Sequence, residues 1–247
     1  MKLMRYGLIL ILLSVWSACS KDKKQDPVDR DITGTVTVYD EFGVASNDVV
    51  GVVVAISDGS KVYTTQTIQN GRYNFSRIPF GKYSLTVAKT GFGTNKRFGI
   101  QHQKSVDSAN YPLQIAPIGI TQKSSTTITS YSALAKPNGS FDFWLTISPA
   151  TGAGTTPRYY RIFVGADSLV AWNHWDVFVP AMTVTGSGMS ANFQSLPRQD
   201  FPIGSKAWVK IYGDAGPNNM YYDSTLHEFI FPCLNTNTQP PVPIIVQ

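Results

Sequence analysis

Two tryptophans, an amide, an imidazole and a carboxylate lie within five consecutive residues of this chain, from Trp172 to Asp176. Indole rings stack on the apolar faces of sugar rings, while amide and imidazole groups bind hydroxyls. Trp172, Asn173 and His174 are therefore a candidate binding surface for a glycan or a protein. The alternative is structural, because in an extended segment Trp175 takes the face opposite to Trp172 and packs into a core.

Few other residues are arranged for catalysis or metal binding. His102, His174 and His227 lie in three separate segments, without the short His or Cys spacing of metal sites. Glu41 and Glu228 are the only glutamates, so a paired-carboxylate hydrolase would need aspartates brought together by the fold. The sequence contains no phosphate-binding or dinucleotide-binding glycine motif. We predict a non-catalytic protein without metal or cofactor, and a hydrolase is the weakest alternative.

The N-terminal residues have the order of an export signal. Lys2 and Arg5 precede an apolar run at residues 8–16, and small residues follow directly before Cys19. The run is too short to span a bilayer. This order resembles the lipobox of bacterial lipoproteins, which implies cleavage after residue 18 and lipid on Cys19. A disulfide between Cys19 and Cys233 is the alternative, because these are the only cysteines.

Charge and the lipobox together predict a cell-envelope protein. The chain has 247 residues and a formal charge of +5, and residues 1–18 carry two of its basic residues. The remaining charge is too small for a nucleic-acid binder, and the basic group at residues 21–24 would contact lipid headgroups beside the anchor. Ser20 after the cysteine implies, through the same resemblance, the outer membrane of a Gram-negative bacterium. The periplasmic and surface faces both stay open.

Strand-like patterns predict an all-β chain with two consecutive β-sandwich domains after a cleaved lipoprotein signal peptide. Short runs rich in Val, Thr and Tyr alternate with turn residues, and no segment has useful helical periodicity. The C-terminal residues are rich in Asn, Thr, Gln and Pro, which is typical of a flexible tail. We expect a signal peptide at 1–18, a lipidated tether at 19–30, sandwiches at 31–115 and 116–233, and the tail at 234–247.

The first sandwich contains a motif of regularly spaced aromatic residues. Residues 71–85 read G-x-Y-x-F-x-x-I-P-x-G-x-Y-x-L and follow Asn70-Gly71, a dipeptide that indicates a tight hairpin turn. This motif resembles the carboxypeptidase regulatory-like domain, a transthyretin-like β-sandwich, over about residues 31–100. The resemblance implies a fold without catalytic residues of its own. We expect strands at 32–39, 49–56, 61–67, 72–76 and 82–88.

The second sandwich is expected from about seven further runs. Trp144, the run at residues 160–164 and the segment at 193–209 resemble a fibronectin type III or immunoglobulin-like domain, which implies a two-sheet fold. We expect strands at 126–131, 140–147, 158–165, 175–184, 191–196, 206–212 and 225–231.

Three serines follow aspartates in triplets that resemble the O-glycosylation acceptor of Bacteroidetes proteins: Ser108, Ser168 and Ser224. The alternative is that these triplets are ordinary turn residues. Together the patterns predict a lipid-anchored envelope module that binds or scaffolds, with a glycan or an outer-membrane protein as its partner. A purely structural envelope component is the alternative. Exposure of Trp172 would favour binding, and its burial would favour the structural role.

Overall fold

The computed structural model describes residues 29–104, 111–138, 140–149, 156–185, 188–193, 196 and 200–247, and of residues 188–193 the backbone alone. These residues form β-strands and one short 3-10 turn. Nowhere in these ranges does a helix have the length and apolar character needed to cross a bilayer. The prediction of an all-β fold is confirmed. The predicted lipidation residue Cys19 and the predicted glycosylation residue Ser108 lie outside the described residues.

The first module is a sandwich of two sheets. One sheet has the order β4-β3-β6-β7, and in the other β1 pairs with β5, β2, β8 and β9. Strand β7 is not among the strands that the sequence predicts. The elements are β1 (Asp29–Tyr39), β2 (Ala45–Ser46), β3 (Val53–Ser57), β4 (Val62–Gln66), η1 (Gln69–Gly71), β5 (Arg72–Pro79), β6 (Gly81–Ala88), β7 (Asn95–His102), β8 (Leu113–Gln114) and β9 (Ile118–Thr121).

The aromatic motif packs between these two sheets. Tyr73 and Phe75 come from β5, and Tyr83 and Leu85 come from β6. All four side chains are buried in one core, where the rings of Tyr73 and Phe75 lie 5.8 Å apart, edge to face. Because β5 and β6 belong to different sheets, the motif fixes how the sheets face each other.

The turn at Asn70-Gly71 has the predicted backbone but not the predicted role. Both residues have positive φ, 60° at Asn70 and 68° at Gly71. However, β4 pairs with β3 while β5 pairs with β1, so the turn carries the chain from one sheet to the other. The predicted hairpin between paired strands does not form.

The first module extends past the predicted boundary at residues 115 and 116. Strand β9 pairs in parallel with β1, in the register Val36 with Ile118. Ile118 and Ile120 are buried in the first core. Pro112 and Pro117 interrupt the strand pattern, but the chain continues along the same edge of β1 on both sides of this break.

The second module also has two facing sheets. Their orders are β10-β11-β15 and β13-β12-β16-β19, with β14 beside β12. The segment predicted as a strand at 225–231 contains only the short β18, which pairs with β17 in a small hairpin outside both sheets. The strands are β10 (Thr127–Ala135), β11 (Phe141–Ser148), β12 (Arg158–Gly165), β13 (Val177–Phe178), β14 (Met182–Val184), β15 (Gly188–Phe193), β16 (Lys206–Asp214), β17 (Tyr221–Asp223), β18 (Glu228–Ile230) and β19 (Val242–Ile245).

The predicted flexible tail at 234–247 is wrong, because its end forms the edge strand β19. Lys206 to Val209 of β16 pair with this strand. Ile244 and Val246 are 5% and 2% exposed, whereas Ile245 between them is 53% exposed. This alternation is that of an edge strand with one buried face, and an edge position tolerates Pro243, which has no N–H to donate.

The outer face of the β12–β16 sheet carries a second, smaller core of aromatic residues. Its buried members include Phe163 and Phe231, whose ring centroids lie 5.0 Å apart. Arg161 is completely buried here, and its Nε donates to Asp214 Oδ2 at 2.7 Å while its guanidinium lies 4.8 Å from the centre of the Phe231 ring. Burial raises the pKa of Asp214 to about 6, and the charge of Arg161 opposes this shift.

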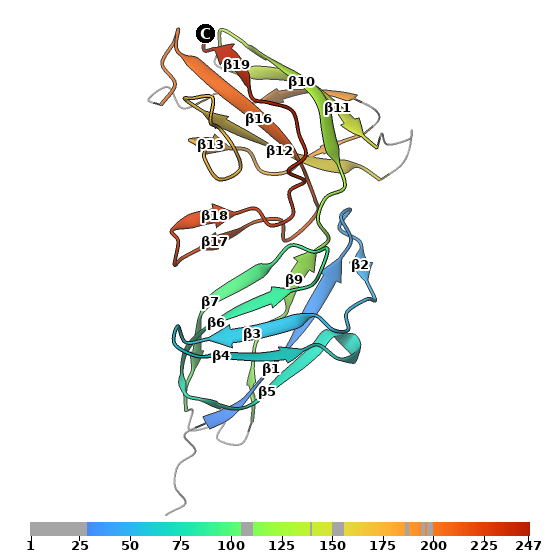
Figure 1. Ribbon diagram of the computed structural model, residues 1–247, viewed down its shortest axis with the longest axis vertical. Coiled ribbons are helices and arrows are strands. Elements are labelled where there is room, and N and C mark those ends of the chain that lie inside the picture. The colour runs from blue at the N-terminus through green and yellow to red at the C-terminus, as the bar shows by residue number, and fades with distance from the viewer. Residues whose placement is uncertain are drawn as a thin grey trace, which may run out of the picture.

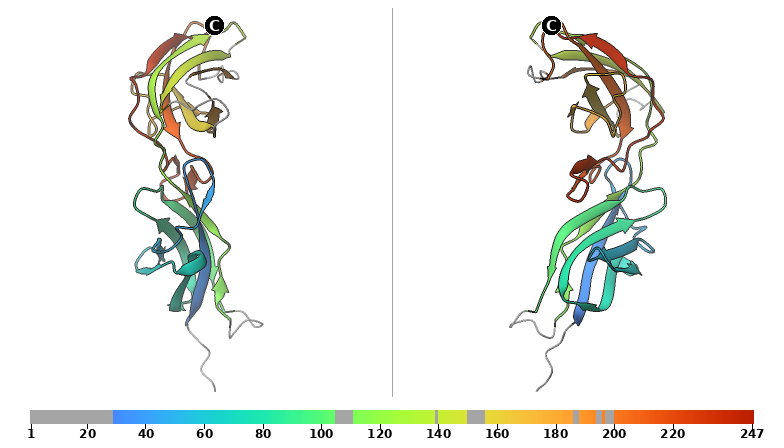
Figure 2. Two further views of the ribbon diagram at one scale, coloured as in Figure 1. Left: turned by 90° about the vertical axis from the view of Figure 1, so that its right-hand side faces the viewer. Right: turned by 60° about the vertical axis from the view of Figure 1, so that its left-hand side comes forward.

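The two modules lie end to end along the long axis, with the β17–β18 hairpin beside the junction (Figure 1). Both views of Figure 2 show the hairpin at the narrow waist between them. Lys96 Nζ of β7 lies 2.9 Å from Asp223 Oδ2 of β17. Cys233 is a free, fully buried thiol at this junction, where it contacts the Thr121 carbonyl at 3.5 Å. Burial raises the pKa of Cys233 to about 12.

Candidate binding groove around Trp172

Trp172 lies in a tight turn, not in an extended strand. The N–H of Ala171 donates to the carbonyl of His174 at 2.7 Å, and the N–H of His174 donates back to Ala171 at 3.1 Å. Trp172 and Asn173 occupy the two positions between them and are both exposed, with Trp172 at 38%. The turn therefore presents an indole ring and an amide to solvent on a backbone that two hydrogen bonds hold closed.

Trp175 anchors this turn in the aromatic core. Its ring centroid lies 4.8 Å from that of Phe178 in an edge-to-face arrangement, and 6.3 Å from that of Phe231. Aromatic pairs in this geometry stabilise a fold beyond the area that they bury. The two tryptophans thus have different surroundings: Trp175 packs inward, while Trp172 is exposed.

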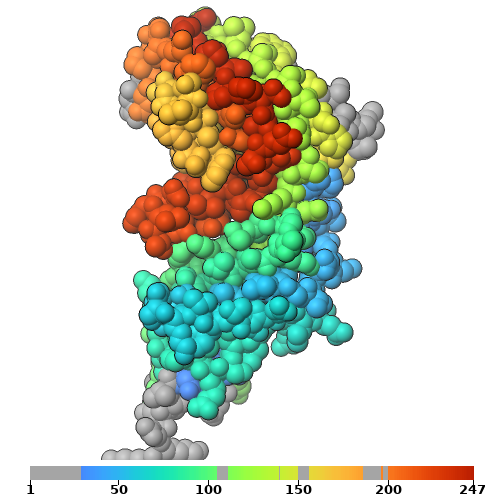
Figure 3. All heavy atoms as spheres, in the orientation of Figure 1, coloured from blue at the N-terminus to red at the C-terminus, as the bar shows by residue number. Residues whose placement is uncertain are grey.

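The first hollow beside Trp172, which we name the hairpin hollow, lies between the turn and strand β18. It has a volume of about 260 Å³, and Figure 3 shows the notch between the yellow-orange turn segment and the orange-red hairpin. Both aromatic and polar side chains surround it, and sequence reasoning did not find the contribution of β18. The lining residues are Trp172, Asn173, His174, Trp175, Glu228, Phe229 and Ile230.

His174 and Asp167 form a polar pair beside this hollow. His174 Nε2 lies 3.3 Å from Asp167 Oδ2, and both side chains are more than half exposed. The backbone N–H of Leu169 and, second, the His174 side chain lower the pKa of Asp167. Because both side chains are more than half exposed, they can also form hydrogen bonds to a ligand.

The second hollow, which we name the junction hollow, lies on the other side of Trp172, where the modules meet. It has a volume of about 320 Å³ and is walled mainly by apolar side chains. Trp172 and Ile230 line both hollows and separate them. The lining residues are Phe92, Thr94, Lys123, Trp172, Ile230, Phe231, Pro232, Leu234 and Thr236. We name these two hollows together the groove around Trp172, and residues from both modules line it.

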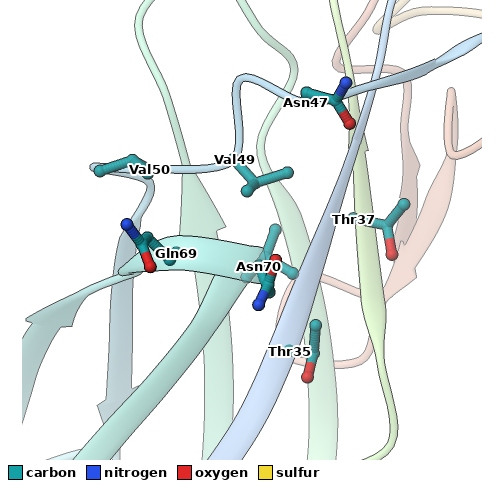
Figure 4. Close-up of a pocket in the computed structure, with 8 residues that line it drawn as sticks. Thr35, Thr37, Asn47, Val49, Val50, Gln69 and Asn70 are labelled. Atoms are coloured by element: carbon teal, nitrogen blue, oxygen red, sulfur yellow. The ribbon is translucent and has the colours of Figure 1, made fainter.

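A larger hollow in the first module lacks aromatic and charged residues. It has a volume of about 530 Å³ and lies between β1 and the turn η1 (Figure 4). Hydroxyl, amide and small apolar groups face it, but no ring is present for stacking. The lining residues are Thr35, Val36, Thr37, Asn47, Val49, Val50, Gln69 and Asn70. The groove around Trp172 offers more of the groups that bind a sugar.

Trp144, one of the residues behind the fibronectin-like resemblance, is a second exposed tryptophan. It is 44% exposed on the outer face of β11, opposite Ser132 of β10. The signal was present in the sequence, since Phe143 and Leu145 alternate with Trp144 and Thr146. The apolar members point inward, so parity places Trp144 outward.

The two described glycosylation candidates lie in exposed turns. Ser168 and Ser224 are exposed, and each follows an aspartate whose side chain accepts a backbone N–H two residues further on. The aspartates Asp167 and Asp223 therefore stabilise the turns, whether or not the serines are glycosylated.

Among the described residues, no group of three or more His, Cys, Asp or Glu side chains could hold a metal ion.

Comparison with known proteins identifies the first module. Residues 31–114 match the family described as Carboxypeptidase regulatory-like domain, which confirms the resemblance of the aromatic motif. The match ends before β9. A comparison of the chain with curated proteins gives no match.

Three of the solved structures with some similarity come from species of Bacteroides and Parabacteroides. A DUF3823 family protein from Bacteroides ovatus is 14% identical, with 89% of this chain and 100% of that chain covered and a TM-score of 0.33. A candidate carbohydrate binding protein from Bacteroides uniformis is 11% identical, with coverage of 88% and 99% and a TM-score of 0.31. A DUF3823 family protein from Parabacteroides merdae is 10% identical, with coverage of 76% and 92% and a TM-score of 0.29. These similarities are too low to bear on the fold or the function of this chain.

Proposed function

We propose that this protein is a lipid-anchored, non-catalytic module of the bacterial cell envelope that binds a glycan in the groove around Trp172. One observation carries this proposal. The Trp172 indole is exposed at the tip of a hydrogen-bonded turn and forms the shared wall of two hollows. An exposed aromatic ring flanked by concave, partly polar surface is the arrangement that sugar rings need for stacking and hydroxyl binding.

The surrounding groups suit neutral hydroxyls on the hairpin side. Asn173 and His174 offer an amide and an imidazole, and Glu228 offers a carboxylate, all from exposed positions. The turn needs little rearrangement on binding because its backbone is already closed and Trp175 holds it against Phe178. A pre-organised site loses less conformational entropy when a ligand binds.

Lipid attachment at Cys19 would place the groove away from the membrane. Strand β1 (Asp29–Tyr39) starts at the end of the first module that is far from the second module (Figure 1). A Cys19→Ala variant should be recovered in the soluble fraction, because two or more acyl chains, at about 0.8 kcal/mol per buried methylene, account for stable anchoring. A variant that stays in the membrane fraction would contradict the anchor.

A screen of the full chain, purified in detergent, against immobilised neutral and acidic oligosaccharides tests the binding function. We expect at least one glycan to bind the wild-type protein and not the Trp172→Ala variant. If no glycan binds, the purely structural role becomes the better account.

The structural role is the second candidate, and the junction between the modules favours it. Ion pairs and backbone hydrogen bonds join the modules, as a spacer would require. A hydrolase is the weakest candidate. We also propose a fibronectin type III or immunoglobulin-like second module, which the facing three-stranded and five-stranded sheets support, and O-glycosylation at Ser108, Ser168 and Ser224.

A further inference from the structure

We propose that the junction hollow binds the carboxylate of an acidic sugar, with Lys123 as the positive partner and Trp172 as the stacking surface for the ring. This inference rests on the proposed glycan-binding function and adds the charge and the orientation of the ligand. The evidence for this inference is the difference in charge between the side chains that line the two hollows.

Lys123 is the only charged side chain among the described residues that line the junction hollow. It is exposed and forms no ion pair with any described residue. Its neighbours behave differently: Lys96 is paired with Asp223 at 2.9 Å, and Lys89 with Asp48 at 2.7 Å. The ammonium group of Lys123 is therefore available to an anionic ligand.

The backbone holds Lys123 in place at the junction. Its N–H donates to the Gly91 carbonyl at 3.0 Å, and the next residue, Ser124, donates to the Cys233 carbonyl at 2.9 Å. Apolar side chains such as Phe92 and Leu234 form the walls of the hollow. An ion pair is stronger beside such walls than in open water, because water screens it less.

The hairpin hollow has the opposite charge, which sets the direction of the ligand. Glu228 lines that hollow, and among the described residues that line it the only basic group is His174, which already faces Asp167 at 3.3 Å. A carboxylate would be repelled by Glu228 and attracted by Lys123. The acidic ring therefore lies in the junction hollow, and a neutral ring lies in the hairpin hollow, with Trp172 between them.

A matched pair of probes tests this inference on the full chain in detergent. The probes are a disaccharide of one glucuronic acid joined to one glucose, and its methyl ester, which keep the same rings and linkage but differ by one charge. Calorimetric titration should give an affinity about tenfold higher for the acid, as expected for one charge-assisted hydrogen bond. Added salt should weaken binding of the acid more than binding of the ester.

Variants separate the inference from the proposed function. Lys123→Gln should reduce binding of the acid about tenfold and leave the ester unchanged, whereas Lys82→Gln, at an exposed lysine of β6, should change neither. Trp172→Ala should weaken both. Equal affinities of acid and ester, or an unaffected Lys123→Gln variant, would overturn the acidic-sugar inference. The acidic-sugar inference would also be overturned if neither probe binds while a neutral glycan still binds through Trp172. In each of these results the proposed glycan-binding function would stand. Failure of every glycan would overturn both.

Discussion

The carboxylate of Glu41, in the first module, lies 3.6 Å from the guanidinium Nη1 of Arg158, in the second module. Both side chains are almost buried, with 11% and 12% exposed. The same carboxylate accepts the backbone N–H of Ser125 at 2.7 Å and its hydroxyl at 2.6 Å. Glu41 thus connects the β1–β2 turn to the second module through three contacts with two residues, Arg158 and Ser125.

Removing this carboxylate should loosen the junction. We expect Glu41→Ala to lower the free energy of unfolding by about 1–3 kcal/mol, because a charged acceptor is lost and Arg158 keeps only its hydroxyl partners, Ser125 and Thr126. Urea unfolding measures this change. Asp48→Ala is the control, since its ion pair with Lys89 is 68% exposed on the carboxylate side and should contribute less than about 1 kcal/mol. Equal effects of the two variants would show that Glu41 does not hold the junction.

Phe75 should be among the residues on which the first module depends most. It is 4% exposed and packs edge to face against Tyr73. We expect Phe75→Ala to lower the free energy of unfolding of the full chain by about 3–5 kcal/mol, because the lost ring leaves a cavity between the sheets. A loss below about 1 kcal/mol in urea unfolding would mean that Phe75 does not fill the core.

His102 should make the first module less stable at mildly acidic pH. Burial lowers its pKa below the ordinary 6.5, and the nearby charge of Arg30 acts in the same direction. Protonation therefore favours the unfolded chain, so this contribution is complete above about pH 6.5 and falls as the pH drops below it. We expect urea unfolding at pH 7.5 and 5.5 to show a larger loss for the wild type than for His102→Gln.

The control for this pH effect is to compare the loss of stability between pH 7.5 and 5.5 in the wild type with the same loss in His102→Gln. Asp214 has a raised pKa of about 6, so its own contribution rises as the pH falls and opposes that of His102. Because Asp214 is present in both proteins, its effect cancels when their pH differences are compared. An identical pH dependence of the wild type and His102→Gln would contradict the account of His102.

The sequence predicted where strands lie better than it predicted which strands pair with each other. Period-two patterns located Arg158–Gly165 as a strand, and the aromatic motif identified the family of the first module. Alternation shows which residues share a face, but it does not show which sheet a strand joins. For this reason Asn70-Gly71 suggested a hairpin, and the pairing of β9 with β1 was missed.

Tertiary context decided the remaining differences. Arginine side chains usually lie at the surface, but Arg161 is buried in the second module, where it pairs with Asp214, a residue remote in sequence. The proline-rich C-terminus gained an edge strand because Ile244 and Val246 fit the open side of β16. At the groove, the residue types from Trp172 to Asp176 singled out the segment, but they did not predict that it forms a turn. Lys123 and Glu228 could not be found, because only the folded chain brings them to Trp172.

The most direct test of the central claim compares three tryptophan variants by calorimetric titration with the glycan that the screen selects, together with their melting temperatures. Trp172→Ala should abolish detectable binding and leave the melting temperature almost unchanged, because its ring is exposed at the turn. Trp175→Ala should lower the melting temperature by several degrees, because its ring packs in the aromatic core. Trp144→Ala, at a similarly exposed tryptophan on another face, should bind like the wild type. Unchanged binding by Trp172→Ala, or an equal loss in Trp144→Ala, would contradict the assignment of the groove as the binding site.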